Sequence, residues 1–339
     1  DYTDGGCPVL LTEPQSTNLI TQSNDFSDSY WTKVDLSVIE GFASPDGSSN
    51  AFKLVEDGTN YFHYCRRLNL AVASGSIVTL SMFAKKSENS YVALFEGSVG
   101  ATVFFNLETK TVVSESGGGS GTIEQFSDDW CRVTLTVTVP STIANFEIYN
   151  SNDGTSLTYQ GVSGNGVYIY GAQLEELSYS TSLIPTYGAV RTRLQDTVLG
   201  AGTSSDFNST EGTFFWEGSF LSNGRIEINS ADNLYRVIIG FSSSVFYRIR
   251  ANAVNIITHF FSSANEYNRN YKIAVRYQSG NSCIYVNGVK ESDSDAFSLL
   301  GLSEVNFVSE GQELTGKTSQ IQVFKTALSD AELQTLTTI

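Results

Sequence analysis

The segment CRVTLTVTV at residues 131–139 decides how this sequence folds. From Val133 to Val139 every second residue is Val or Leu, every intervening residue is Thr, and Pro140 follows at once. Side chains alternate between the two faces of a strand, so this pattern predicts a half-buried β-strand with one apolar and one hydroxylated face. Proline has no N–H to give to a sheet, and it marks the end of the strand.

Segments of the same kind lie on both sides of this strand. We expect strands at residues 77–84, 102–107, 111–113, 146–149, 167–170, 214–220, 271–277 and 283–286, the last followed by the hairpin signal Asn287-Gly288. The C-terminal end of the chain predicts a helix instead of a strand, because Ser329 and Glu332 form a capping-box pattern before Leu333 and Leu336. Short strands with frequent turns favour an all-β fold of two β-sandwich domains and one short C-terminal helix.

Charge excludes several classes of partner. The 339 residues include 20 Lys and Arg and 36 Asp and Glu, a net charge of −16. Such a chain without basic clusters is a poor ligand for nucleic acid and is repelled by anionic lipid. No apolar run approaches the ~18 residues that a transmembrane helix requires. The first residues, Asp1 to Pro8, match neither a signal peptide nor a native start, so we expect a fragment or a processed form.

The charge also differs along the chain. Residues 1–190 carry 8 basic and 21 acidic residues (8 − 21 = −13), whereas residues 191–339 carry 12 and 15 (12 − 15 = −3). A small, polar stretch without periodicity lies near residue 200. We therefore expect an N-terminal extension at 1–12, a first domain at 13–190, a linker at 191–204 and a second domain at 205–339.

The four cysteines, Cys7, Cys65, Cys131 and Cys283, are scattered and contain no CxxC pair, which argues against a zinc site. A disulfide between Cys65 and Cys131 is possible if their strands pair. Buried free thiols in a protein made in a reducing cytoplasm are the favoured alternative.

Three segments resemble a module common in bacteriophage tail-fibre and head-fibre proteins, which is itself similar to carbohydrate-binding modules of jelly-roll fold. They are LLTEPQSTNLITQSNDFSDSYWTK (10–33), DDWCRVTLTV (128–137) and YIYGAQLEELSYSTSLIPTYGAVRTR (168–193). Two later segments, YKIAVRYQSGNSCIYVNGV (271–289) and IQVFKTALSDAELQTL (321–336), resemble a laminin-G-like, concanavalin A-like domain. Together the resemblances cover nearly the whole chain.

The resemblance implies a virion surface protein, a tail or head fibre segment made in the host cytoplasm. Its partners would be host surface polysaccharide, other virion proteins and two further copies of the chain in a homotrimer. Neither nucleic acid nor membrane insertion is expected. The leading hypothesis is a non-enzymatic receptor-binding segment. The alternatives are a polysaccharide depolymerase (glycosidase or lyase), a purely structural virion module, and a secreted bacterial glycan-binding adhesin.

Sugar binding needs flat aromatic rings beside planar polar groups, and arginine where the glycan is acidic. Two clusters of Tyr and Arg fit this chemistry. The first holds Tyr61, His63, Tyr64, Arg66 and Arg67. The second holds Tyr235, Arg236, Tyr247, Arg248, Arg250, Tyr267 and Arg269. The alternative is that these arginines pair with surplus carboxylates on an outer face.

Catalysis is poorly supported. A Ser–His–Asp triad would need His63 or His259, and the nearest acidic motif, Glu291-Ser-Asp293-Ser-Asp295, is predicted to be a solvated loop. We therefore expect no catalytic residues.

Jelly-roll modules of the resembled kind often tie their first and last strands with a structural calcium. In the matching segments the candidate ligands are Asn24, Asp25, Gln173 and Glu175. Ordinary turn and cap roles are the alternative for these four residues, and no other cofactor is expected.

Overall fold

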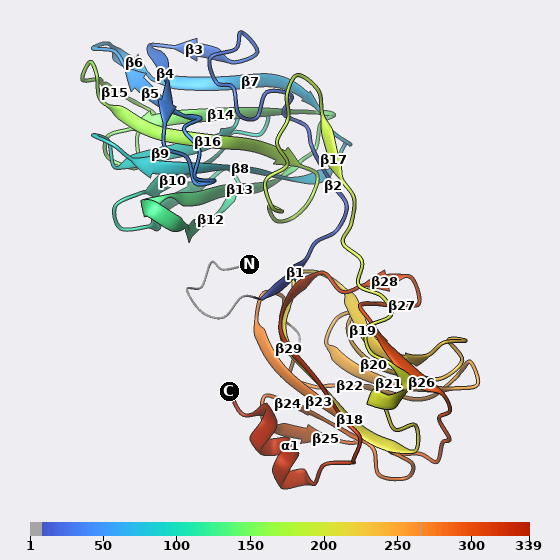
Figure 1. The fold of residues 1–339 in the computed structure, drawn as a ribbon. Helices are drawn as coiled ribbons and strands as arrows, with labels where there is room; N and C mark the ends of the chain where they lie inside the picture. The colour runs from blue at the N-terminus through green and yellow to red at the C-terminus, as the bar shows by residue number, and fades with distance from the viewer. Residues whose placement is uncertain (1–8, 265) are drawn as a thin grey trace. The chain divides into compact units, whose positions relative to one another are not determined.

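The structure, a computed structural model, describes residues 9–264 and 266–339, which divide into two compact units. We call residues 15–194 the first sandwich, and residues 9–14 with 195–339 the second sandwich. Figure 1 shows layers of antiparallel strands in each unit and one α-helix near the C-terminus. The predicted all-β fold, with two β-sandwiches and one short C-terminal helix, is confirmed over the described residues.

The first sandwich contains two six-stranded sheets. One has the order β11 (Thr111–Ser116), β10 (Ala101–Asn106), β9 (Tyr91–Glu96), β14 (Ile143–Ser151), β7 (Tyr64–Ala71) and β3 (Thr32–Val34). The other has the order β12 (Ser120–Gln125), β13 (Cys131–Val139), β8 (Ser76–Lys86), β16 (Gly166–Glu175), β5 (Ala51–Glu56) and β4 (Leu36–Phe42). Two short pairs join β15 (Thr158–Gln160) to β6 (Asn60–Phe62), and β17 (Arg191–Arg193) to β2 (Ser16–Asn18). A 3₁₀ turn, η1, spans Ser127–Asp129.

Strand β13 explains the core of this unit. It lies between β12 and β8, and Val133, Leu135 and Val137 are buried in the core between the two sheets while Thr138 is exposed. The apolar half of the predicted alternation therefore faces the core, whereas the threonine face is exposed only at Thr138, since Thr134 is buried and Thr136 is half-buried. Burying these branched side chains supplies the hydrophobic free energy that holds the sheets together.

The second sandwich also contains two sheets. One has the order β1 (Leu10–Thr12), β29 (Gly316–Phe324), β18 (Glu211–Phe220), β23 (Asn270–Gln278), β24 (Cys283–Val286) and β25 (Val289–Glu291). The other, which we call the five-stranded sheet, has the order β22 (Val254–Phe260), β21 (Val245–Ala251), β20 (Arg236–Phe241), β19 (Gly224–Ser230) and β26 (Leu302–Asn306). This unit also contains a hairpin of β27 (Val308–Ser309) and β28 (Gln312–Glu313) and a 3₁₀ turn, η2 (Ser204–Asp206).

The helix α1 (Asp330–Thr337) begins as the sequence predicts. Ser329 is the N-cap, its side chain accepts from the Glu332 N–H, and the Glu332 carboxylate accepts from the Ser329 N–H at 2.8 Å. Leu333 packs with Phe215 and Tyr285, on the side of their sheet that faces away from the main core.

The segments expected as an N-terminal extension and as a linker form strand pairs within the two sandwiches. Strand β1, within the stretch expected as an extension, pairs with β29 of the second sandwich. In the expected linker, Arg191–Arg193 pairs with Ser16–Asn18, and Ala201 forms a bridge with Val305.

Cys65, Cys131 and Cys283 are buried free thiols, so Cys65 and Cys131 are not bridged, and Cys7 lies outside the described residues. Burial raises the pKa of Cys65 to about 12, so this thiol stays protonated and unreactive at neutral pH. Within the described ranges, no helix has the length and apolar character to cross a membrane.

Replacing Leu135 with Ala tests the role of β13. Because Leu135 is fully buried, the cavity should lower the free energy of unfolding by about 2–5 kcal/mol, as measured by urea denaturation. Thr138→Ala, on the exposed side of the same strand, is the control and should change stability by about 0.5 kcal/mol or less. Equal effects of the two substitutions would contradict the assignment of the faces.

Candidate functional site: an arginine face on the second sandwich

The outer face of the five-stranded sheet carries four arginines, which we call the arginine face: Arg225, Arg236, Arg248 and Arg250. Their neighbours along the strands, such as Ile226, Tyr247 and Ile249, point into the core. Strand periodicity then sends Arg225, Arg248 and Arg250 to the other side. The same sheet that builds the core therefore aligns guanidinium groups on its outer surface.

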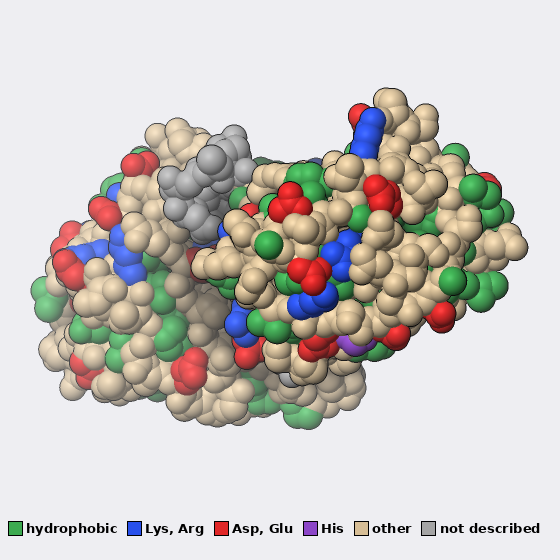
Figure 2. Space-filling view, turned by 90° about the horizontal axis from the view of Figure 1, so that it is seen from below, with side chains coloured by type: hydrophobic (Ala, Val, Ile, Leu, Met, Phe, Trp, Pro, Cys, Tyr) green, Lys and Arg blue, Asp and Glu red, His purple; other side chains and the backbone are tan. Residues whose placement is uncertain are grey.

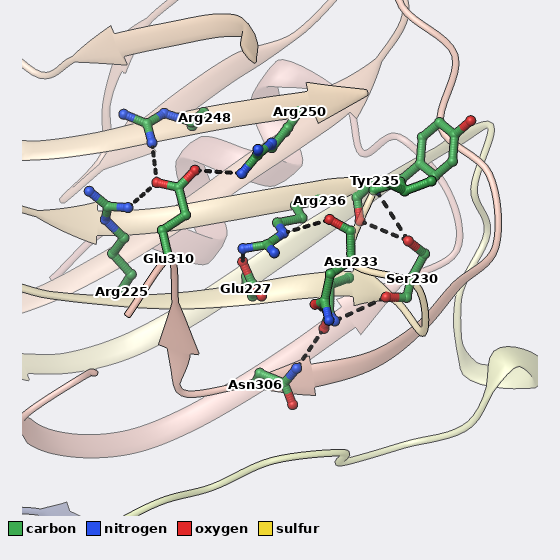
Figure 3. Close-up of polar contacts among 12 residues, drawn as sticks. Arg225, Glu227, Ser230, Asn233, Tyr235, Arg236, Arg248, Arg250, Asn306 and Glu310 are labelled. Carbon is green, nitrogen blue, oxygen red and sulfur yellow. Dashed lines mark hydrogen bonds and ion pairs between the residues drawn. The ribbon is translucent and has the colours of Figure 1, made fainter. Parts of the chain in front are cut away.

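Three of these arginines converge on one carboxylate. Glu310, in the turn between β27 and β28, accepts from Arg248 Nη1 at 2.6 Å and from Arg250 Nη1 at 2.8 Å, and Arg225 Nη1 also donates to it (Figure 3). Partial burial acts to raise the pKa of Glu310, but the three guanidiniums outweigh it and hold that pKa below its usual value. The carboxylate is therefore ionised at neutral pH, and it balances one of three positive charges.

Arg236 has a different partner. Its Nη1 lies 3.4 Å from Glu227 Oε2 on β19, and its Nε donates to the Asn233 carbonyl (Figure 3). Burial raises the pKa of Glu227, against the effect of its contacts with Ser309 and Arg236. This pair is thus internally matched, whereas the Glu310 group has an excess of positive charge.

Aromatic rings lie beside the guanidiniums. Phe246 on β21 lies under Arg225 and Arg248, whose Cζ atoms are 5.6 Å and 5.5 Å from the ring centroid. Phe260, its partner on β22, is 5.3 Å from Phe246 between ring centroids and is 48% exposed. A planar cation and an exposed ring therefore stand on one face, and these are the groups that bind acidic sugars.

The structure corrects part of the predicted second cluster. Tyr247 is fully buried in the core, so it offers no ring to a polysaccharide. Tyr235 packs against the same core. Tyr267 is exposed but bonds Asn223 through its hydroxyl, and Arg269 pairs with Glu266 at 3.5 Å. Arg225, Phe260 and Glu310 were not predicted, because their link to Arg248 depends on cross-strand pairing.

The first cluster lies mainly in a packed group of rings on the first sandwich. Tyr64 and Tyr149 are buried with centroids 5.0 Å apart, and Tyr149 donates to the buried Glu147 at 2.9 Å. Arg66 lies 3.7 Å from Glu147 and covers the Tyr64 ring. Burial raises the pKa of Glu147, although Tyr149 and Arg66 act in the opposite direction. Little ring surface is left for a ligand here.

The remaining members of the first cluster separate. His63 is fully buried, and its Nδ1 lies 2.8 Å from the Asp35 carbonyl, so a glycan cannot reach it and its predicted role needs correction. Tyr61 is 53% exposed and packs on Phe62. Arg67 lies over the Tyr30 ring, 4.3 Å from its centroid.

The four predicted calcium ligands are held by hydrogen bonds of the protein. Glu175 accepts from Ser16 and Thr181, and Gln173 Oε1 accepts from the Ile184 N–H. Asp25 caps the turn at Ser27, and Asn24 contacts Tyr170. Asn24 Oδ1 is buried and has no hydrogen-bond partner, and no group of three or more His, Cys, Asp or Glu suited to a metal occurs in the described part of the chain. Calcium binding by the protein stays a prediction.

One group resembles a catalytic triad in composition. Glu291 Oε2 lies 2.9 Å from His259 Nε2, and its other oxygen accepts from the Ser262 hydroxyl. In a nucleophilic triad the histidine stands between serine and carboxylate, whereas here the carboxylate stands between the other two. The contacts instead join β22, at the edge of one sheet, to β25, at the edge of the other.

Charges of both signs are mixed over the surface. Figure 2 shows Lys and Arg side chains interspersed with Asp and Glu side chains on the face it presents. Any attraction of a polyanion to such a surface must be local, at places where arginines outnumber carboxylates.

Comparisons with known proteins add little beyond this. No family model matches the sequence, and no curated protein matches it. Among solved structures, a native heptameric SAP-like pentraxin from Limulus polyphemus is similar with a TM-score of 0.31 and 13% identity, over 41% of this chain and 71% of that one. Domains LG4-5 of mouse laminin alpha1 chain are similar with a TM-score of 0.27 and 12% identity, over 80% of this chain and 92% of that one. Trypanosoma rangeli sialidase in complex with sialic acid is similar with a TM-score of 0.29 and 10% identity, over 90% of this chain and 62% of that one. With such low scores the fold assignment rests on the sheets themselves.

The contact of Glu291 with His259 and Ser262 predicts a pH effect on stability. Burial acts to raise the pKa of Glu291, but hydrogen bonds from Ser262 and His259 outweigh it and lower the pKa below 4.5. A depressed carboxyl pKa gives stability that is present above the unfolded value and lost as pH falls through the folded one. Glu291→Gln should therefore lower the Tm at pH 7 by an amount equivalent to at most about 1 kcal/mol.

The difference in Tm between this variant and the wild type should shrink as the pH falls below the usual range of a glutamate carboxyl and Glu291 takes up a proton. Glu217→Gln is the control, because the side chain of Glu217, on β18, forms no hydrogen bond or ion pair with the described residues. A difference that stays constant with pH would show that the Glu291 contacts do not stabilise the sandwich through charge.

Proposed function

We propose that the chain is a non-enzymatic glycan-binding protein that adheres to cell-surface polysaccharide through the arginine face. The observation that carries this proposal is the convergence of Arg225, Arg248 and Arg250 beside the exposed ring of Phe260. Guanidiniums bind acidic or hydroxyl groups of a sugar in a planar geometry, while a ring covers the apolar side of a pyranose.

We propose further that the chain is a segment of a bacteriophage tail or head fibre that binds a host polysaccharide. The support is the resemblance of residues 10–33, 128–137 and 168–193 to fibre modules. On a virion, the partners would be other structural proteins and further copies of the chain. Repeated display would raise the avidity of an individually weak site.

A non-enzymatic role is supported by the Ser262–Glu291–His259 order, in which the serine hydroxyl bonds the carboxylate and not the histidine. Residues 292–295, the rest of the nearest acidic motif, are exposed and lie outside any strand. A depolymerase would release oligosaccharides from a bound polysaccharide over time. Such release, lost on substitution of one carboxylate, would replace this proposal with the enzymatic alternative.

Replacing Arg248 and Arg250 together with Ala tests the proposal. We expect at least a tenfold loss of affinity on an array of acidic microbial polysaccharides, because each charge-assisted contact contributes about 1.5–3 kcal/mol. Binding of an acidic glycan by the wild type should also weaken as salt rises. The variant should stay folded, because both arginines lie on the outer face of the sheet and Glu310 keeps its contact with Arg225.

The matched control is Lys272→Ala with Lys325→Ala. It removes the same two positive charges from the second sandwich, at positions on or next to the other sheet. Unchanged binding by the arginine variant would exclude this face, and an equal loss in both variants would indicate a general charge effect. Failure of the wild type to bind any polysaccharide would favour a structural module.

A further inference from the structure

We propose that Glu310 occupies the place of a ligand carboxylate, so that the arginine face is a receptor for carboxylated sugars that the protein itself partly blocks. This inference rests on the proposed glycan-binding function and deepens it by naming the ligand class and an internal competitor.

The contacts of Glu310 are those that an anionic ligand would make. Arg225 comes from β19, and Arg248 and Arg250 come from β21, yet all three reach one side chain from a separate hairpin (Figure 3). Each guanidinium uses its Nη1 atom for this contact. Two positive charges remain unbalanced by Glu310, and the three arginines have no other carboxylate partner among the described residues.

Two further donors at the same place are unsatisfied. The Nε atoms of Arg225 and Arg250 are buried and have no hydrogen-bond partner. A single Glu310 carboxylate, held through Nη1 atoms alone, leaves these donors unused. A ligand with a carboxylate and neighbouring hydroxyls offers more acceptors than Glu310 does.

The turn that carries Glu310 gives an independent argument. Glu310 and Gly311 join β27 to β28 and both have positive φ, 52° and 75°. A two-residue turn of this kind favours Asn, Asp or Gly at its first position, because those residues tolerate the left-handed region. Glutamate lacks that advantage, so its presence here is explained by its side chain, which is long enough to reach the arginines. The hairpin thus presents a carboxylate at a cost in local conformation.

The adjacent ring narrows the class of ligand. Phe260 remains 48% exposed and stands on the same face of the sheet as Arg248, through its pairing with Phe246. A carboxylate bound between the arginines would carry its sugar ring toward an apolar surface of this kind. The chemistry fits a pyranose that bears a carboxylate, as uronic and sialic acids do.

Glu310→Gln tests the inference directly. Removing the internal anion should raise the affinity for carboxylated oligosaccharides roughly tenfold, the change expected if about a tenth of the wild type has the arginines open. The probes are a glucuronate-terminated and a sialate-terminated oligosaccharide, each beside its carboxyl-reduced, neutral counterpart, in titration calorimetry. The neutral counterparts should gain no affinity, and adding Arg225→Ala to the variant should remove the gain.

Two further variants keep the test decisive. Glu310→Asp shortens the side chain by one methylene while suiting the turn, so a folded protein with a gain in affinity is expected even if the Gln variant is unstable. Glu266→Gln removes the same charge from an exposed pair with Arg269, outside the arginine face, and should bind as the wild type does.

The outcomes separate this inference from the proposed function. If the wild type binds glycans but neither folded Glu310 variant binds carboxylated probes more tightly, the inference is overturned and the proposed function stands. If the gain is equal for charged and neutral probes, Glu310 does not stand in for a carboxylate, and the inference also fails. If no variant and no wild-type protein binds any glycan, both fail together.

Discussion

The two-residue period of an antiparallel strand is the constraint on which the rest of this structure depends. Each strand of the sandwiches must give one set of side chains to the core and the other to an outer face. In β21 the core takes Tyr247 and Ile249, and Arg248 and Arg250 are thereby placed outside. The arginine face is the surface counterpart of the core, and neither can be shifted without the other.

The same constraint explains how far the sequence could be read. The alternation around Leu135 and the capping box at Ser329 are local patterns, and local patterns predicted the sandwich strands and the helix. The error over Tyr247 arose within one strand, because a residue next to an outward arginine must point inward. His63 was misplaced for a related reason: it stands between β6 and β7, and its ring is enclosed.

The other parts of the site are not local. Arg225 precedes Glu310 by 85 residues, and only the pairing of β19 with β20 and of β20 with β21 brings Arg225 beside Arg248. No periodicity in one segment contains that information. The one available signal was a glutamate before a glycine in a short hairpin, a place where asparagine or aspartate is usual.

The pairing of β1 with β29 has a consequence for how the chain is connected. The first sandwich is enclosed in sequence between a strand of the second sandwich and the remainder of that sandwich. A single cut by a protease near residue 200 would break one covalent connection but leave residues 10–12 in their sheet. The two fragments would then stay associated through the backbone hydrogen bonds of β1 and β29, so that a chain nicked at this point would retain both of its parts.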